Sequence, residues 1–200
     1  MNKNATLIDM GYGNFPSLAS FLKRLGYKIT IQTINDSFQK SDLLIIPGIG
    51  NSNIINNINK KSDIYEYITS YEKHQNIILG ICLGMQMMCM SSQESKNIFN
   101  GFNVFPYDVV ILPNNLKQKV PRIGWYESSL TNKDQSNPIK LYYSHSYYVD
   151  SHSTKDICML TNHGEKPIPA IIRNNNIIGF QFHPELSGDN GADIFQEIIR

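Results

Sequence analysis

The sequence predicts an α/β fold, with a central, mostly parallel sheet flanked by helices and a strand-rich second half. Up to about residue 98, short apolar runs alternate with helical patterns, which is typical of a parallel sheet covered by helices. Several of these runs end in glycine-containing turns. Beyond that point the chain consists of strand-like stretches joined by short polar turns. We expect one domain over residues 1–200, without repeats or a long linker.

The first half carries the parallel part of the expected sheet. Its predicted elements are strands over 5–9, 28–33, 43–46 and 76–81, helices over 15–25 and 64–74, and a weak helical face over 51–60. In parallel sheets, ligands bind outside the carboxyl ends of the strands. The turns over 11–13 and 47–50 and the residue Cys82 all follow such strands, so we expect them to share one rim.

The second half is expected to add strands and one terminal helix. The predicted strands cover 102–112, 119–125, 140–149, 157–161, 170–173 and 177–182. Three asparagines over 174–176 separate the last two strands and indicate a hairpin loop. The segment over 191–200 is expected to be a short helix with its apolar residues turned inward.

Composition excludes several classes of protein. The formal charge of +1 gives no basic surface for nucleic acid or anionic membranes. Three cysteines in 200 residues do not indicate a disulfide framework. No secretory signal pattern is present, and no apolar run approaches the ~18 residues of a membrane span. We therefore expect a soluble protein of the reducing cytoplasm.

The most informative stretch joins the strand over 76–81 to a predicted helix. Its sequence Gly80-Ile81-Cys82-Leu83-Gly84 matches the G-x-S-x-G nucleophile elbow with cysteine in place of serine. Glycines allow the sharp turn, and the start of a helix favours a thiolate. The alternative is a buried structural cysteine after a strand.

A cysteine nucleophile requires a base and a group that orients the base. Of the five histidines, His183 has the most suitable surroundings, because a strand leads into it and Glu185 follows two residues later. Residues i and i+2 of an extended chain project to the same side, so the carboxylate can contact the imidazole. The alternative is a strand-end histidine with a solvated glutamate. Cys89, two turns along the predicted helix, and Cys158 are expected in the core, and no metal site is predicted.

His145 is a weaker candidate for chemistry. It lies beside Ser146, but adjacent residues on a strand face opposite ways, so a Ser–His pair is not favoured. We expect a structural or interface role for it.

Together, the cysteine and histidine motifs resemble the class I (triad) glutamine amidotransferase family. The likeness is closest to the glutaminase subunit of imidazole glycerol phosphate synthase, the HisH type. It extends, in order, over Ile8-Asp9-Met10-Gly11-Tyr12-Gly13-Asn14, Ile46-Pro47-Gly48-Ile49-Gly50, Val120-Pro121-Arg122-Ile123-Gly124-Trp125, Ser144-His145-Ser146-Tyr147-Tyr148-Val149 and Ser187-Gly188. The resemblance covers essentially the whole chain and implies a flavodoxin-like fold for this type 1 domain.

The resemblance also implies a mechanism, glutamine hydrolysis through a thioester. The implied roles are Cys82, His183 and Glu185 in catalysis, Leu83, Gly48 and Ile49 in the oxyanion hole, and Gly50, Gln86, Ser146 and Tyr147 in glutamine binding. No cofactor is implied. The ammonia would pass to a separate synthase in a heterodimer, most simply the cyclase of histidine biosynthesis.

Three alternatives stay open: supply of ammonia to a sugar amidotransferase that makes acetamidino sugars of surface polysaccharides, a non-catalytic regulatory subunit, and a freestanding cysteine hydrolase. The sequence departs from the HisH pattern in ways that concern the partner. Leu186 stands where a lysine is usual after His-Pro-Glu, and Arg122 and Tyr126 replace the commoner histidine and asparagine. Asn14 and Tyr142 lie where relatives line the subunit contact. None of these positions belongs to the triad, so the departures bear on the synthase rather than on glutamine hydrolysis.

Overall fold

A computed structural model describes residues 3–11, 13–33, 36, 41–48, 50, 66, 68, 70, 76–94, 99–114, 118–132, 137–151 and 153–200. The strands of these ranges are β1 (Lys3–Asp9), β2 (Tyr27–Thr33), β3 (Leu43–Ile46), β4 (Ile77–Ile81), β5 (Cys89–Ser92), β6 (Phe99–Asn100), β7 (Phe105–Ile111), β8 (Arg122–Leu130), β9 (Ile139–His145), β10 (Tyr147–Asp150), β11 (Ile157–His163), β12 (Lys166–Asn174) and β13 (Ile177–Phe180). The helices are α1 (Phe15–Arg24), α3 (Leu83–Met87), α4 (Gly188–Ile198) and the 3-10 helix η2 (Pro184–Leu186).

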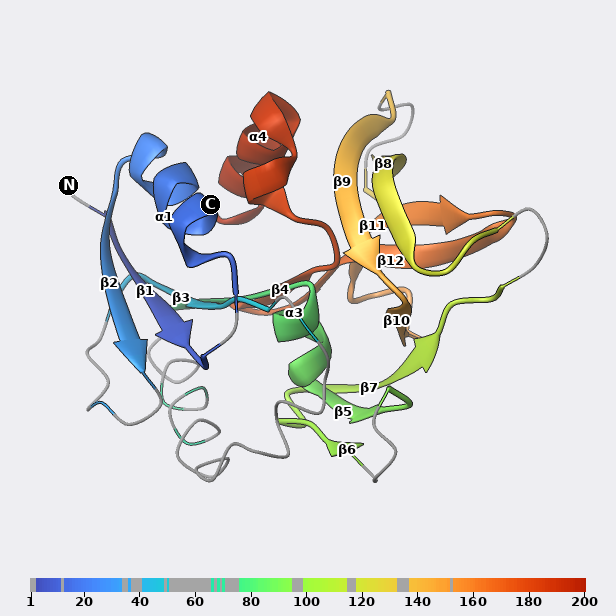
Figure 1. Cartoon of the computed structure of the whole chain (residues 1–200), viewed down its shortest axis with the longest axis horizontal. Helices are drawn as coiled ribbons and strands as arrows, with labels where there is room; N and C mark the ends of the chain where they lie inside the picture. The colour runs from blue at the N-terminus through green and yellow to red at the C-terminus, as the bar shows by residue number, and fades with distance from the viewer. Residues whose placement is uncertain are drawn as a thin grey trace.

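In the described ranges the strands form two sheets (Figure 1). The larger has nine strands in the order β2-β1-β3-β4-β13-β12-β11-β8-β9, and the smaller has four in the order β10-β7-β5-β6. From β2 to β13 the neighbouring strands of the larger sheet are parallel, and from β13 to β9 they are antiparallel. The predicted α/β fold with a strand-rich second half is confirmed, and in the described ranges the larger sheet is mixed, with one parallel half and one antiparallel half.

The parallel strands are in a register that brings their carboxyl ends to one edge. Leu7 of β1 pairs with Ile45 of β3, which in turn pairs with Leu79 of β4. The described residues that directly follow these strands therefore lie along the same rim, as the sequence predicted. Cys82, which follows Ile81 at the end of β4, is part of it.

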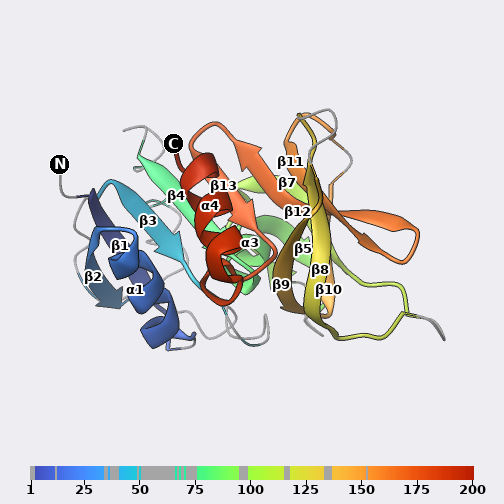
Figure 2. The ribbon, with the colours of Figure 1, turned by 90° about the horizontal axis from the view of Figure 1, so that it is seen from above.

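Helices α1 and α4 cover one face of the parallel strands, and α3 lies on the other side together with the smaller sheet (Figures 1 and 2). Successive residues of a strand face opposite sides, and accordingly Leu7 packs in one core cluster and Ile8 in the other. The first cluster includes Phe21 of α1 and Phe195 of α4, whose rings meet edge to face at a centroid distance of 5.3 Å. The second includes Met85 of α3 together with residues of the smaller sheet.

The helix expected after Cys82 is shorter than the sequence suggested. It ends at Met87, and Cys89 begins strand β5, so the placement of Cys89 two helical turns along was wrong. Its predicted burial in the core is confirmed. The helix stops because the carbonyls that would continue it are taken up by a later segment: Phe102 N–H donates to Met87 O at 2.8 Å, and Phe105 N–H to Met88 O at 2.9 Å.

The single strand expected over 140–149 is divided in two. β9 pairs with β8 in the larger sheet, whereas β10 pairs with β7 in the smaller one. Ser146 stands at the bend, and the Nδ1–H of His145 donates to Tyr147 O at 2.8 Å across it. The chain crosses between sheets here because both flanking segments have partners elsewhere. The crossing places Tyr147 close to α3, where its carbonyl accepts from Gln86 Nε2 at 2.8 Å.

The remaining boundaries differ by a few residues, except that the strand expected over 119–125 runs instead from Arg122 to Leu130. β12 and β13 form the expected hairpin, with Asn175 in the left-handed region at φ 54°. The helix expected over 51–60 and most of the one over 64–74 lie outside the described residues, although Glu66, Ile68 and Ser70 are helical. None of the helices in the described ranges is long and apolar enough to cross a membrane.

Candidate active site

Cys82 occupies a strained turn between β4 and α3. Its φ and ψ are 51° and −109°, a combination that non-glycine residues rarely adopt and that is often found at active sites. Backbone hydrogen bonds hold the turn on both sides: Cys82 N–H donates to Phe180 O at 2.6 Å, and Gln86 N–H donates to Cys82 O at 3.1 Å. The backbone geometry is therefore that of a nucleophile elbow.

The two glycines of the elbow are required by close backbone contacts. A Cβ on Gly84 would lie 1.9 Å from Ile46 O, and a Cβ on Gly80 would lie 2.7 Å from the Cα of Met85. Such distances are shorter than real Cβ contacts allow. The prediction that glycines permit this tight turn is confirmed.

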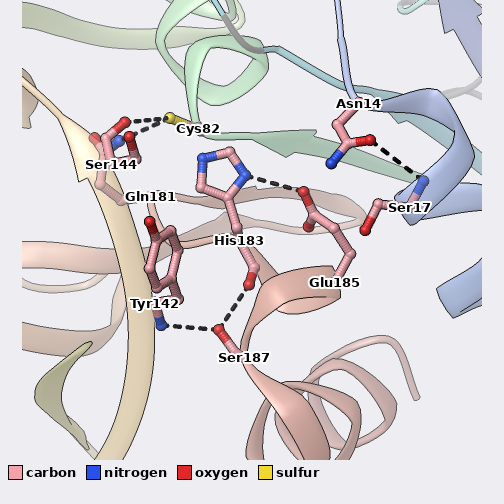
Figure 3. A network of polar contacts seen from close by, with 9 residues as sticks. All are labelled: Asn14, Ser17, Cys82, Tyr142, Ser144, Gln181, His183, Glu185 and Ser187. Atoms are coloured by element: carbon pink, nitrogen blue, oxygen red, sulfur yellow. Dashed lines mark hydrogen bonds and ion pairs between the residues drawn. The ribbon is translucent and has the colours of Figure 1, made fainter. Parts of the chain in front are cut away.

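His183 lies between Cys82 and Glu185 (Figure 3). Its Nδ1–H donates to Glu185 Oε1 at 3.0 Å, and both side chains are buried. The predicted contact is present, but only His183 itself is extended, because Pro184–Leu186 form the 3-10 helix η2. The short helix, rather than a continued strand, turns the carboxylate back onto the ring.

The electrostatics of this cluster favour a charged imidazole. Burial by itself lowers the pKa of His183, but the charge and hydrogen bond of Cys82, followed by those of Glu185, raise it to about 10. At neutral pH the ring is therefore protonated. A neighbouring imidazolium stabilises a thiolate, the reactive form of a cysteine nucleophile.

Strand β9 supports both reactive side chains through its backbone (Figure 3). Tyr142 O accepts from His183 N–H at 2.9 Å, and Ser144 O accepts from the Cys82 thiol at 3.7 Å. Ser187 adds a further link, because its hydroxyl accepts from Tyr142 N–H at 2.9 Å and donates to His183 O at 2.6 Å. Ser187 had no predicted role in catalysis, although its position directly after the His-Pro-Glu-Leu segment was a signal.

A buried amide network lies on the other side of the sulfur. Gln181 Nε2 donates to Cys82 Sγ at 3.8 Å, and Gln181 Oε1 accepts from Gln86 Nε2 at 3.1 Å. Gln86 Nε2 also donates to Tyr147 O at 2.8 Å. The structure thus brings Gln86 and Tyr147, both predicted to bind glutamine, close to the nucleophile. Gln181 was not singled out by sequence, and only its position two residues before His183 could have indicated it.

Two of the three predicted oxyanion-hole residues, Leu83 and Gly48, lie against each other at the elbow. Leu83 is the first residue of α3, and Gly48 packs so closely on it that a Cβ on Gly48 would lie 2.5 Å from Gly84 N and 2.6 Å from Leu83 Cβ. Ile49 lies outside the described residues. Gly50, which follows it, is exposed and has a φ of 134°.

The surroundings of the other histidine and cysteine candidates indicate structural rather than catalytic roles. His145 is buried, and burial, opposed by the hydrogen bond to Tyr147 O, lowers its pKa to about 3, so the ring is neutral. Cys158 is only partly buried but packs against the core. Asn14 caps α1, accepting from Ser17 N–H at 3.4 Å. Within the described ranges, no group of three or more His, Cys, Asp or Glu side chains is placed to hold a metal ion.

Comparisons with known proteins agree with this geometry. The family model for "Glutamine amidotransferase class-I" matches residues 6–199. The chain is 31% identical to imidazole glycerol phosphate synthase subunit HisH of Halalkalibacterium halodurans, an alignment covering 95% of this chain and 92% of the relative. It is 34% identical to the HisH of Caldanaerobacter subterraneus, covering 97% and 98%.

A solved structure, that of PurLQS from Thermotoga maritima, shares the fold with a TM-score of 0.73 at 17% identity, covering 100% of this chain and 98% of that one. The family model and both sequence relatives extend over nearly all of the residues analysed above. The chain therefore belongs to the class-I glutamine amidotransferase family.

Proposed function

We propose that this chain, as one domain over 1–200, is a cytoplasmic glutaminase subunit that hydrolyses glutamine and delivers the ammonia to a separate synthase. The observation that carries the proposal is the arrangement of Cys82, His183 and Glu185, in which the imidazole lies between the thiol and the carboxylate. Membership of the amidotransferase family supplies the substrate class. The raised pKa of His183 supplies the charge state that the first step needs.

The proposed reaction proceeds in two halves. The Cys82 thiolate attacks the side-chain carboxamide carbon of glutamine, forming a carbon–sulfur bond and an oxyanion. The protonated His183 then gives its proton to the departing nitrogen, so that ammonia leaves and a thioester remains. Neutral His183 next takes a proton from water, which attacks the thioester, releases glutamate and restores the thiolate. Glu185 keeps the ring oriented and its charge balanced throughout.

Backbone donors would stabilise the oxyanion formed in both halves. The N–H of Leu83, at the start of α3, is one proposed donor, and the turn containing Gly48 and Ile49 would supply the second. The close packing of Gly48 on Leu83 supports this placement. Loss of one such donor typically costs about 10²–10³ in rate, so the conformation of this turn would control activity.

The glutamine itself would be held by residues around the elbow. We assign this role to Gly50, Gln86, Ser146 and Tyr147. The hydrogen bond from Gln86 to Tyr147 O supports the grouping, because it joins α3 to the bend between the two sheets, next to Cys82.

The proposed acceptor is the cyclase of imidazole glycerol phosphate synthase, in a heterodimer with this chain. Two observations support a protein partner near the site: the relatives are named as subunits of that synthase, and apolar side chains are exposed beside His183. Trp125 is 53% exposed and meets Tyr142 edge to face, and Leu186 is exposed directly after the triad glutamate. Exposed apolar groups gathered at one place indicate a contact surface.

A second acceptor, a sugar amidotransferase, is favoured by the departures from the HisH pattern. Leu186 is uncharged and exposed where a lysine is usual. The other two departures, Arg122 and Tyr126, are buried or partly buried on β8 and do not belong to an exposed surface. A different synthase surface would account for the change at Leu186.

Ammonia release from glutamine tests the proposal, measured for the purified chain alone and with the cyclase of the same organism plus its nucleotide substrate. Marked stimulation is the expected result, and Cys82→Ala should abolish it while leaving complex formation intact. Hydrolysis that the cyclase does not change would transfer the search to sugar amidotransferases. Hydrolysis retained in Cys82→Ala, or none with either synthase, would contradict the proposal.

A further inference from the structure

Arg122 is a charged side chain in the interior of the antiparallel half. It is 1% exposed and links three neighbouring strands. Its Nη2 donates to Thr161 Oγ1 at 2.8 Å on β11, while its guanidinium carbon lies 3.7 Å from the ring centroid of Tyr126 on β8 and 4.2 Å from that of Tyr143 on β9. The guanidinium therefore stacks on the Tyr143 ring and connects β9 with β8 and β11.

The position of Tyr143 connects this cluster with the active site. Its two neighbours along β9 are Tyr142, whose carbonyl accepts from His183 N–H, and Ser144, whose carbonyl accepts from the Cys82 thiol. The Tyr143 ring is buried in the interior, while the carbonyls before and after it contact the backbone N–H of His183 and the thiol of Cys82. A shift of Tyr143 would move both carbonyls together.

We propose that Arg122 is a positioning residue, which acts through Tyr143 to keep the β9 backbone aligned with Cys82 and His183. The inference rests on the catalytic roles proposed above for those two residues. It assigns Arg122 no contact with glutamine or with the reacting atoms. Its effect is on the distance and direction between thiol and imidazole.

A purely stabilising role fits the surroundings of Arg122 poorly. Among the described residues its Nε and Nη1 have no hydrogen-bond partner, and burial lowers the pKa of the guanidinium. Taking a charge out of water costs free energy, and even buried ion pairs can often be replaced by well-packed apolar residues without loss of stability. Planar stacking on two tyrosines, in contrast, fixes orientation, which a flexible apolar chain cannot do.

Two variants decide the question. Arg122→Met removes both the charge and the planar guanidinium group, whereas Arg122→Lys keeps the charge but removes the planar group. The control is Glu127→Gln, an exposed position on the same strand. For each variant, kcat and KM for glutamine are measured with the synthase partner, together with the thermal midpoint and the rate of Cys82 alkylation by iodoacetamide across pH. Peptide mass spectrometry separates Cys82 from the other cysteines.

We expect both Arg122 variants to lower kcat by about tenfold to a hundredfold, the range typical of a small misplacement of reacting groups, with little change in KM. Alkylation of Cys82 should slow in parallel, and the thermal midpoint of Arg122→Met should equal or exceed that of wild type. Adding Tyr143→Leu to Arg122→Met should reduce kcat no further than either change alone, because both act through one ring.

Several results would overturn the inference. One is a wild-type kcat in either Arg122→Met or Arg122→Lys. Another is a loss of kcat that is fully explained by the fraction of unfolded protein. A third is a kcat loss in the double variant that equals the sum of the losses, in free energy, of the two single variants. A wild-type chain that neither hydrolyses glutamine with its partner nor alkylates at Cys82 would instead refute the proposed function. The two failures are thereby distinguished.

Discussion

The Glu185→Gln substitution removes the carboxylate charge beside His183 while keeping the size of the side chain. In the intact protein, His183 Nδ1–H donates to Glu185 Oε1 at 3.0 Å. Burial lowers the pKa of His183, but the charges and hydrogen bonds of Cys82 and then of Glu185 raise it to about 10. The substitution tests the second of these contributions without emptying the space around the ring.

The size of the effect follows from the contact. A hydrogen bond to a charged group contributes about 1.5–3 kcal/mol, and one pH unit of pKa corresponds to about 1.36 kcal/mol. Loss of the carboxylate charge should therefore lower the pKa of His183 by about 1–2 pH units. The amide oxygen of glutamine still accepts from Nδ1–H, so the ring should keep its orientation.

The assay is an NMR titration of the histidine side-chain nitrogens, with the His183 signal assigned by its loss in His183→Asn. Cys82→Ala serves as the comparison, because Cys82 contributes more than Glu185 to raising the pKa of His183. Its pKa should therefore fall further in Cys82→Ala than in Glu185→Gln. An unchanged His183 pKa in Glu185→Gln, or a larger fall there than in Cys82→Ala, would refute the reasoning.

Four further outcomes are expected. Gly84→Ala should lower the free energy of unfolding in urea by about 3 kcal/mol or more, because its Cβ would lie 1.9 Å from Ile46 O. Ser187→Ala should lower kcat by about tenfold with unchanged KM, because one of its hydrogen bonds holds the backbone of His183. Leu186→Glu should weaken binding of the synthase in calorimetry, because a charge would enter an exposed apolar contact. The unfolding free energy should fall as pH rises from about 6.5 to about 10, because the raised pKa of His183 stabilises its protonated form in the folded state.

Two of these outcomes have a control variant, and the other two have a result that would contradict them. A Gly26→Ala variant separates the close contact of Gly84 from a general glycine effect, since a Cβ on Gly26 meets nothing within 4 Å, although its φ of 85° adds strain of its own. Retained kcat in Ser187→Ala, or unchanged synthase binding in Leu186→Glu, would show that those contacts do not matter. A pH slope that survives in His183→Asn would assign it to another group.

The parallel half and the reactive pair could be predicted from sequence because their signals are local. Apolar strands of four or five residues between helical patterns specify a parallel sheet, and the bounds of β3 agree with the expected ones. The elbow glycines and the His-Pro-Glu segment are short motifs in which each residue has a definite structural or chemical role. The contact of His183 with Glu185 depends on residues only two apart, so its prediction required no knowledge of the fold.

The antiparallel half could not be predicted as well, because its boundaries depend on pairing between distant segments. The division at Ser146 exists since β9 and β10 have partners in different sheets, and the end of α3 at Met87 depends on Phe102 and Phe105. The stacking of Arg122 on two tyrosines from neighbouring strands has no pattern along the chain. From the sequence, Arg122 could be recognised only as a departure from the commoner histidine of the family, and its structural role could not be predicted.

The two halves of the larger sheet position different parts of the active site, so both are needed for catalysis. The parallel half supplies the strained turn that presents Cys82 and the rim that surrounds it. The antiparallel half supplies β9, whose backbone contacts both Cys82 and His183. His183 follows β13, the strand that pairs in parallel with β4 and antiparallel with β12. The distance between thiol and imidazole is thus set across the junction of the two halves, so a change deep in the antiparallel strands can alter chemistry at the end of the parallel ones.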